Sequence, residues 1–244
     1  MVKSGRNAGP GRTVFPKTME IDAATLLHDV STWSVPVLLA ITLHEAAHAY
    51  VADWCGDETA RRLGRVSLDP RKHIDPFGTI LLPGLLLLMH VPFLFGYARP
   101  VPIDARRLGR PRRDRMLVAA AGPAANLLQA IVALLLLKVV VQVDTTGWFT
   151  ATLARAVTLN IALAAFNLLP IPPLDGAHIA IGLLPGNLSQ PMQVLMPHGM
   201  AILIGLVIVL PSIGIATGID LDIVGRLLLA IVEPLMDGLN WLFG

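Results

Sequence analysis

Residues 33–54 read WSVPVLLAITLHEAAHAYVADW, an apolar run with a tryptophan at each end. Its length is close to the ~20 residues that carry a helix across a bilayer, and tryptophan is typical of the two lipid–water interfaces. The run therefore predicts a transmembrane helix over 33–55. Within this helix, His44, Glu45 and His48 form the pattern H-E-x-x-H.

The two histidines stand four residues apart, so a helix places them on one face, where both rings can bind one metal ion. Glu45 is adjacent to His44 and can take a proton from a water molecule at that metal. The competing interpretation is a chance match, in which each histidine is a satisfied residue of a helical core. Two histidines and a glutamate lose hydration in lipid, however, and such groups in a membrane helix usually serve a function. The context favours a metal site.

The composition indicates a membrane protein. The chain has 244 residues, of which 54% are hydrophobic and 15% charged, and its mean hydropathy is +0.65. We expect an all-α polytopic membrane protein in the lipid bilayer, with about five to six transmembrane helices. Nucleic acid is not an expected partner, because the arginine clusters flank apolar segments. The single Cys55 rules out an intrachain disulfide and lies off the His44/His48 face, so packing is its expected role.

Apolar segments divide the chain into three parts. A polar tail and lead-in occupy 1–32, with a short amphipathic stretch from Met19 to Val30. A catalytic membrane core is expected over 33–185, and C-terminal helices over 186–244. The apolar segments themselves are expected at 33–55, 77–97, 116–143, 149–184, 199–217 and 223–243.

The distribution of lysine and arginine predicts the orientation, because basic loops stay in the cytoplasm. The loops 61–72 and 99–115 are strongly basic, whereas 144–148 and 218–222 contain aspartate and no lysine or arginine. A single crossing cannot join two consecutive cytoplasmic loops. The segment near 77–104 is therefore expected to be re-entrant and then extended. A full span with one basic loop on the wrong side is the alternative.

The same charge bias makes the motif helix run from outside to inside. His44 and His48 then lie in the inner half of the bilayer, within reach of cytoplasmic water. We expect a multi-pass protein of the cell membrane whose active site opens toward the cytoplasmic side.

A catalytic zinc site uses three protein ligands and leaves one position for water. A further histidine six residues after His48 would complete one known pattern, but that position is Trp54. A downstream glutamate would complete another, but Glu58 lies in a polar loop and Glu233 lies in the last segment. Asp175 is different, because it follows a proline-broken stretch of an apolar segment, and unwound helices at membrane depth mark binding sites. The same aspartate, followed by glycine, can also form a simple turn between two helices.

The motif pair resembles a known family. HEAAH at 44–48 together with NLLPIPPLDG at 167–176 is similar to the site-2 protease family of intramembrane zinc metalloproteases. AGPAAN at 121–126 resembles the core helix of that family, and the resemblance covers roughly residues 33–185. One departure is Ala177, where many members have a second glycine. The length of the chain implies a minimal form without PDZ or CBS domains.

The resemblance implies a role for each motif residue. One zinc ion per chain would be held by His44, His48 and Asp175. Glu45 would be the catalytic glutamate, and Asn167 would bind substrate. The implied activity is zinc-dependent hydrolysis of peptide bonds in a transmembrane protein substrate.

A membrane metal transporter or metal sensor that uses the same ligands is the rival function. It predicts further polar ligands along a path through the membrane. The candidates His90, His178 and His198 are scattered without helical spacing, and we expect them to be structural or interfacial. A glutamate beside the ligands favours catalysis, because transport needs no base. The sequence leaves the oligomeric state open.

Overall fold

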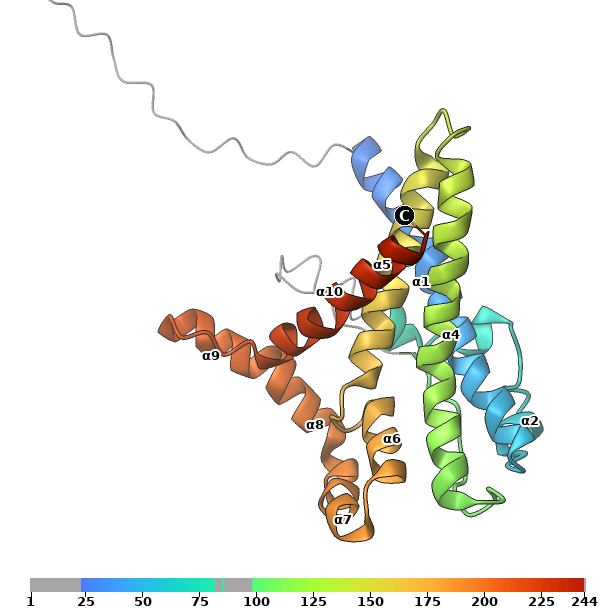
Figure 1. Ribbon diagram of the computed structural model, residues 1–244, viewed down its shortest axis with the longest axis vertical. Helices are drawn as coiled ribbons and strands as arrows, with labels where there is room; N and C mark the ends of the chain where they lie inside the picture. Colours follow the sequence, from blue (N-terminus) through green and yellow to red (C-terminus); the bar gives the residue numbers. More distant parts are fainter. Residues whose placement is uncertain (1–22, 82–84, 86–97, 244) are drawn as a thin grey trace, which may run out of the picture.

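The computed structural model describes residues 23–81, 85 and 98–243 of the chain (Figure 1). These residues form helices and connecting loops, and no β-strand occurs among them, in agreement with the expected all-α class. The elements are α1 (Ala23–Trp54), α2 (Thr59–Arg62), η1 (Pro70–Lys72), η2 (Pro76–Leu81), α4 (Pro111–Val140), α5 (Trp148–Leu168), α6 (Asp175–Leu183), α7 (Gly186–Leu195), η3 (Met196–His198), α8 (Gly199–Ile204), η4 (Gly205–Val209), α9 (Leu210–Thr217) and α10 (Ile223–Phe243).

The chain is a multi-pass membrane protein. Within the described residues, 4 helical stretches are long and apolar enough to cross a bilayer. This number is slightly lower than the five to six that the sequence predicts. The stretches are Ala23–Trp54, Pro111–Val140, Trp148–Leu168 and Gly186–Thr217.

The helix α10 accounts for part of the difference. The predicted span at 223–243 is indeed helical, but every stretch of it long enough to cross the bilayer contains Arg226, Glu233 and Asp237. These charges make α10 amphipathic, and it runs obliquely across α5 (Figure 1). Its apolar side packs against buried residues of α4 and α5 through Val232, Leu235, Met236 and Leu239.

The two ends of the segment expected to be re-entrant meet at one place. The Arg99 N–H donates to the carbonyl of His73 at 2.9 Å, and the Arg65 guanidinium donates to the carbonyl of Arg99 at 2.7 Å. His73 and Arg99, which flank this segment, therefore lie next to each other at the same end of the molecule. Most of the predicted segment 77–97 lies outside the described residues.

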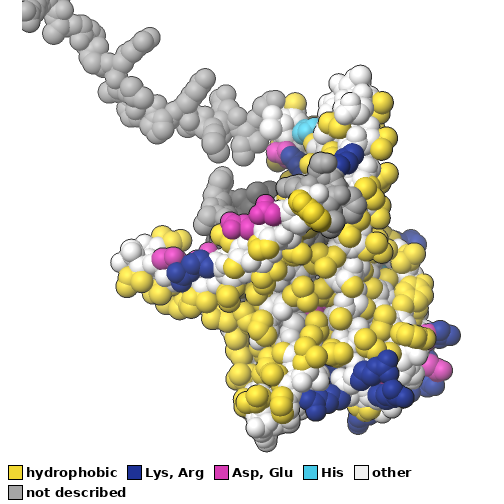
Figure 2. All heavy atoms as spheres, viewed as in Figure 1, with side chains coloured by type: hydrophobic (Ala, Val, Ile, Leu, Met, Phe, Trp, Pro, Cys, Tyr) yellow, Lys and Arg dark blue, Asp and Glu magenta, His cyan; other side chains and the backbone are white. Residues whose placement is uncertain are grey.

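The two basic loops share the end of the bundle at which α1 finishes. The Asp104 N–H donates to the buried carboxylate of Asp57 at 2.7 Å, and the Gly109 N–H donates to the carbonyl of Cys55 at 3.0 Å. Figure 2 shows lysine and arginine side chains gathered over this end. The charge bias of the sequence thus corresponds to a real asymmetry between the two ends of the molecule.

The first helix begins earlier than the sequence predicts. The amphipathic lead-in and the apolar span form one helix from Ala23, so that Pro36 lies inside the helix and not in its first turn. The additional turns contact α5, because the Arg155 guanidinium bonds the Asp29 carboxylate and lies 5.3 Å from the centre of the Trp33 ring. Tertiary contacts with α5 therefore extend α1 beyond the membrane-length run.

The helices α1, α4 and α5 pack on one another as a three-helix bundle. α1 and α5 run in the same direction and α4 runs in the opposite one (Figure 1). α1 and α5 begin at the same end of the bundle, where Trp148 Nε1 donates to the Ser31 hydroxyl at 2.9 Å. Small side chains allow the helix backbones to approach closely. The buried small residues include Ala40, Ala46, Ala49, Ala119, Gly122, Ala130, Ala164 and Ala165.

Candidate metal centre

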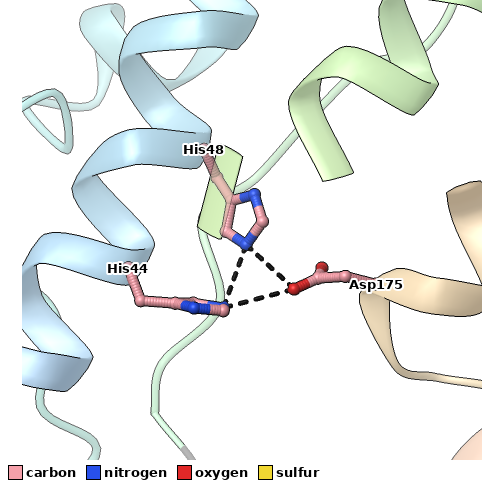
Figure 3. Close-up of side chains that lie close together, drawn as sticks. All are labelled: His44, His48 and Asp175. Atoms are coloured by element: carbon pink, nitrogen blue, oxygen red, sulfur yellow. Dashed lines mark hydrogen bonds and ion pairs between the residues drawn. The ribbon is translucent and has the colours of Figure 1, made fainter. Parts of the chain in front are cut away.

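Three side chains from two distant parts of the sequence converge in the bundle (Figure 3). The helix α1 presents His44 and His48 one turn apart on one face, and their Nε2 atoms are 3.1 Å apart. Asp175, the first residue of α6, points its carboxylate at both rings. Its Oδ2 atom lies 3.3 Å from each Nε2 atom.

A break between α5 and α6 brings Asp175 to this position. α5 ends at Leu168, and Leu169 is extended because the following Pro170 disfavours helical geometry before it. The chain then turns and re-enters a helix at Asp175. A side chain at Gly176 would be impossible here, because its Cβ atom would lie 2.3 Å from the carbonyl oxygen of Leu168. The aspartate is thus the start of a tightly packed helix as well as a candidate ligand.

Both imidazole rings are oriented by hydrogen bonds from their other nitrogen. Nδ1 of His48 lies 2.7 Å from the carbonyl oxygen of Val118, which can only accept. Nδ1 of His44 lies 2.6 Å from Oδ1 of Asn126, whose own Nδ2 donates to Asn160 at 2.7 Å. Each ring therefore carries its proton on Nδ1, and each Nε2 atom turns a lone pair toward the centre.

The arrangement fits a zinc ion. Bonds of about 2.0–2.1 Å to a tetrahedral zinc ion separate the ligand atoms by about 3.3–3.4 Å. The observed separations among the three ligand atoms are 3.1, 3.3 and 3.3 Å. Oδ2 of Asp175 is buried and accepts no hydrogen bond within the described residues. Two lone pairs and a carboxylate oxygen repel one another at this range, and a bound cation turns that repulsion into attraction.

Helix α4 passes directly behind the two rings. A Cβ atom at Gly122 would lie 2.3 Å from Nε2 of His48 and 2.5 Å from Cε1 of His44. Only glycine therefore leaves room for both imidazoles at this depth. The AGPAAN string thus supplies the space for the rings through Gly122 and the hydrogen bond to His44 through Asn126.

A cavity of about 610 Å³ opens onto the three candidate ligands. Glu45 lines it, and Oε2 of Glu45 accepts a hydrogen bond of 2.9 Å from the Val101 N–H in the loop that precedes α4. Asn167, in the last turn of α5, lines the same cavity. Its Nδ2 donates to the carbonyl of Leu163 at 3.0 Å, which uses one of its two amide protons.

The other residues that the sequence analysis considered either lie away from the metal centre or have surroundings that the sequence did not predict. Cys55 is half-buried and lines a separate pocket, His198 lies in η3, and His90 is outside the described residues. Sequence reasoning gave His178 a structural role, yet it lines the cavity. It also gave Asn126 no role at the metal, although an asparagine inside an apolar helix is itself a signal of function.

We expect Asn126→Ala to weaken zinc binding by roughly 10- to 100-fold, because the His44 ring loses the acceptor that fixes its tautomer and orientation. Competition with a fluorescent zinc chelator on the purified protein measures this affinity. Asn187→Ala, an exposed asparagine on α7, is the matched control and should bind zinc like the unmodified chain. An Asn126→Ala affinity within twofold of the unmodified chain would contradict the orienting role.

Several known proteins resemble the chain. The profile of peptidase family M50 matches residues 32–146 and 141–210. The protein named "Putative zinc metalloprotease YwhC" from Bacillus subtilis is 38% identical over 174 residues, which cover 69% of this chain and 76% of YwhC. No solved structure matches the chain significantly.

Two mycobacterial proteins named "Putative zinc metalloprotease Rip2" are also similar. The one from Mycolicibacterium smegmatis is 31% identical over 139 residues, covering 57% of this chain and 52% of Rip2. The one from Mycobacterium tuberculosis strain Erdman is 33% identical over 167 residues, covering 68% of this chain and 60% of Rip2. The matches thus span just over half the length of each Rip2. With the family profile covering most of the sequence and the candidate zinc centre inside the matched region, the chain belongs to peptidase family M50, the site-2 protease family of zinc metalloproteases.

Proposed function

We propose that this metalloprotease is an endopeptidase that cleaves peptide bonds within the membrane, in substrates that are themselves transmembrane proteins. The supporting observation is a cavity that contains the three candidate zinc ligands and is lined by α1 and α4, two helices of membrane-spanning length. A peptide segment must enter this cavity to reach the ligands. An apolar, membrane-embedded segment can do so from the bilayer.

Each polar residue of the cavity has a proposed part in the hydrolysis. A zinc ion held by His44, His48 and Asp175 would lower the pKa of a water molecule and polarise the scissile carbonyl. The Glu45 carboxylate takes a proton from the attacking water and passes it to the leaving nitrogen. The Val101 N–H, 2.9 Å from Oε2, keeps this carboxylate turned into the cavity. Asn167 donates its free amide proton to the substrate backbone or to the developing oxyanion.

The substrate has to be extended at the site of cleavage, because an intact helix hides its carbonyls in hydrogen bonds. The segment 98–104 has no helical structure, its two prolines favour an extended backbone, and it contributes Pro100, Val101 and Ile103 to the cavity wall. Addition of the unwound substrate alongside this segment would satisfy backbone groups of both chains. The prolines leave this segment few N–H donors, so its carbonyl oxygens would carry much of the pairing.

The active site is proposed to face the cytoplasm. The basic loop 99–115 contributes Pro100, Val101 and Ile103 to the cavity wall, and basic loops are retained in the cytoplasm. The division of the chain into a catalytic core over 33–185 and C-terminal helices over 186–244 remains a proposal. Gln193 and Met196 from the second part also line the cavity.

Metal transport or metal sensing is less well supported. A transport path needs several exchange sites in series. In the part of the chain that the structure describes, His44, His48 and Asp175 are the one group of three side chains suited to hold a metal. The carboxylate of Glu45 beside this group has a use in hydrolysis and none in transport.

Glu45→Gln should retain zinc and the fold but lower the cleavage rate by at least about 100-fold, because it removes the general base and leaves the ligands in place. Cleavage of a fluorogenic transmembrane peptide by the protein in phosphatidylcholine vesicles measures this rate. Glu58→Gln, on the exposed side of the basic end, is the matched control and should cleave normally. If Glu45→Gln cleaves as fast as Glu58→Gln, the hydrolytic role of Glu45 is wrong.

Loops at opposite ends of the bundle should be labelled from opposite sides of the cell membrane. With Cys55 replaced by serine, a cysteine at Thr146 should react with an impermeant maleimide added outside intact cells, because its loop lacks basic residues. A cysteine at Lys72 should react only after the cells are opened. Labelling of both positions from the outside, or of neither, would rule out the proposed orientation.

A further inference from the structure

The beginning of α4 lies antiparallel along α6, and polar contacts fix the register of the two helices. Arg112 Nε donates to the carbonyl of Gly182 at 3.0 Å, near the end of α6. A Cβ atom at Gly182 would lie only 2.8 Å from Cβ of Met116, so the helices touch there. One turn further along α4 is Arg115, and one turn back along α6 is His178. These two side chains interact electrostatically and line the catalytic cavity together.

Every arginine of the basic run 106–115 except Arg115 is exposed. Arg106 and Arg107 pair with Asp104, and Arg112 donates to the carbonyls of Gly182 and Leu184 at the end of α6. Arg115 is half-buried and has no hydrogen-bond or ion-pair partner within the described residues. A cation that is partly removed from water without a partner carries a desolvation cost that a bound anion would offset.

His178 supplies a second unpartnered group at the same place. Its Nδ1 atom is buried and makes no hydrogen bond within the described part of the chain. His178 follows Asp175 by three residues, which is about 4.5 Å along the axis of α6. His178 therefore lies about one helical turn from Asp175, and Arg115 lines the cavity beside His178.

The charges of the cavity leave Arg115 uncompensated. The two carboxylates that line the cavity, Glu45 and Asp175, lie at the candidate metal centre, where a divalent cation balances both negative charges. The Arg115 guanidinium then carries the one unbalanced charge among the described residues that line the cavity. A carboxylate matches a guanidinium in both charge and hydrogen-bond geometry.

We propose that Arg115 and His178 form a subsite that binds a carboxylate of the substrate next to the cleaved bond. The inference rests on the proposed peptidase function and narrows its substrate class. An extended chain advances about 3.3 Å per residue, so a step of about 4.5 Å assigns the carboxylate to a residue within about two positions of that bond. The carboxylate belongs either to an aspartate or glutamate side chain or to a free C-terminus that reaches the cavity.

The test uses the zinc-loaded full chain in phosphatidylcholine vesicles and a series of fluorogenic transmembrane peptides. Members of the series differ by glutamate or glutamine at each of the three positions on either side of the cleaved bond. Each is made with a free and with an amidated C-terminus, which distinguishes the two sources of the carboxylate. The kcat/KM of each peptide is measured, and the Kd of the same peptides is measured on Glu45→Gln, which binds without cleaving.

At one position, or at the free C-terminus, the carboxylate should raise kcat/KM and lower Kd by about tenfold or more relative to its neutral counterpart. Arg115→Gln should bring the ratio of kcat/KM between the carboxylate peptide and its neutral counterpart close to one. Arg115→Lys should restore part of this preference. Arg115→Glu should instead favour peptides with lysine at that position. Arg113→Gln removes an exposed arginine outside the catalytic cavity and should leave the ratio unchanged.

The outcomes separate the subsite from the protease function itself. If the unmodified chain cleaves none of the peptides, the proposed function fails and the subsite fails with it. If the chain cleaves them without preferring a carboxylate, or if Arg115→Gln with full zinc content keeps the preference, the subsite is overturned and the protease function stands.

Discussion

Two imidazole nitrogens and one carboxylate oxygen are held within 3.1–3.3 Å of one another, although these atoms repel each other without a cation between them. The rest of the bundle is arranged to maintain this contact. Hydrogen bonds donated by the two rings to the Val118 carbonyl and to Oδ1 of Asn126 direct both lone pairs inward, and Gly122 leaves the space in which the rings lie. Such an arrangement is preorganised for metal, because its electrostatic cost is recovered only when a cation binds.

The site also requires that distant segments reach the same depth of the bundle. α1 and α5 start at the same end, tied there by the contact of Trp148 with Ser31. α5 then stops where its chain meets Pro170, and α6 begins with the aspartate beside the histidines. The loop that precedes α4 reaches the same level from the opposite end and contacts Glu45 through Val101. The proposed hydrolysis needs this convergence, since water, base and metal must meet at one point.

The sequence predicts best what depends on local geometry. The spacing of His44 and His48 predicts one shared face of a helix, and the structure has that face. The chemistry of Asp175 and the broken helix around it make it a candidate third ligand from the sequence, but its approach to the histidines depends on tertiary packing. The early start of α1 and the oblique course of α10 were not predictable from apolar runs. In both cases contacts with α5 decide the outcome. The partnership of Asn126 with His44 likewise depends on the register between helices.

X-ray absorption at the zinc edge tests the central claim most directly, because it reports the ligand atoms around the metal without requiring a substrate. The account predicts one zinc ion per chain with nitrogen and oxygen ligands at about 2.0–2.1 Å, a scattering pattern of two imidazoles, and no sulfur ligand. In Asp175→Ala, either the zinc content or the number of protein ligands should fall. A sulfur ligand at about 2.3 Å, or an unchanged spectrum in Asp175→Ala, would contradict the assignment of His44, His48 and Asp175 as the metal centre.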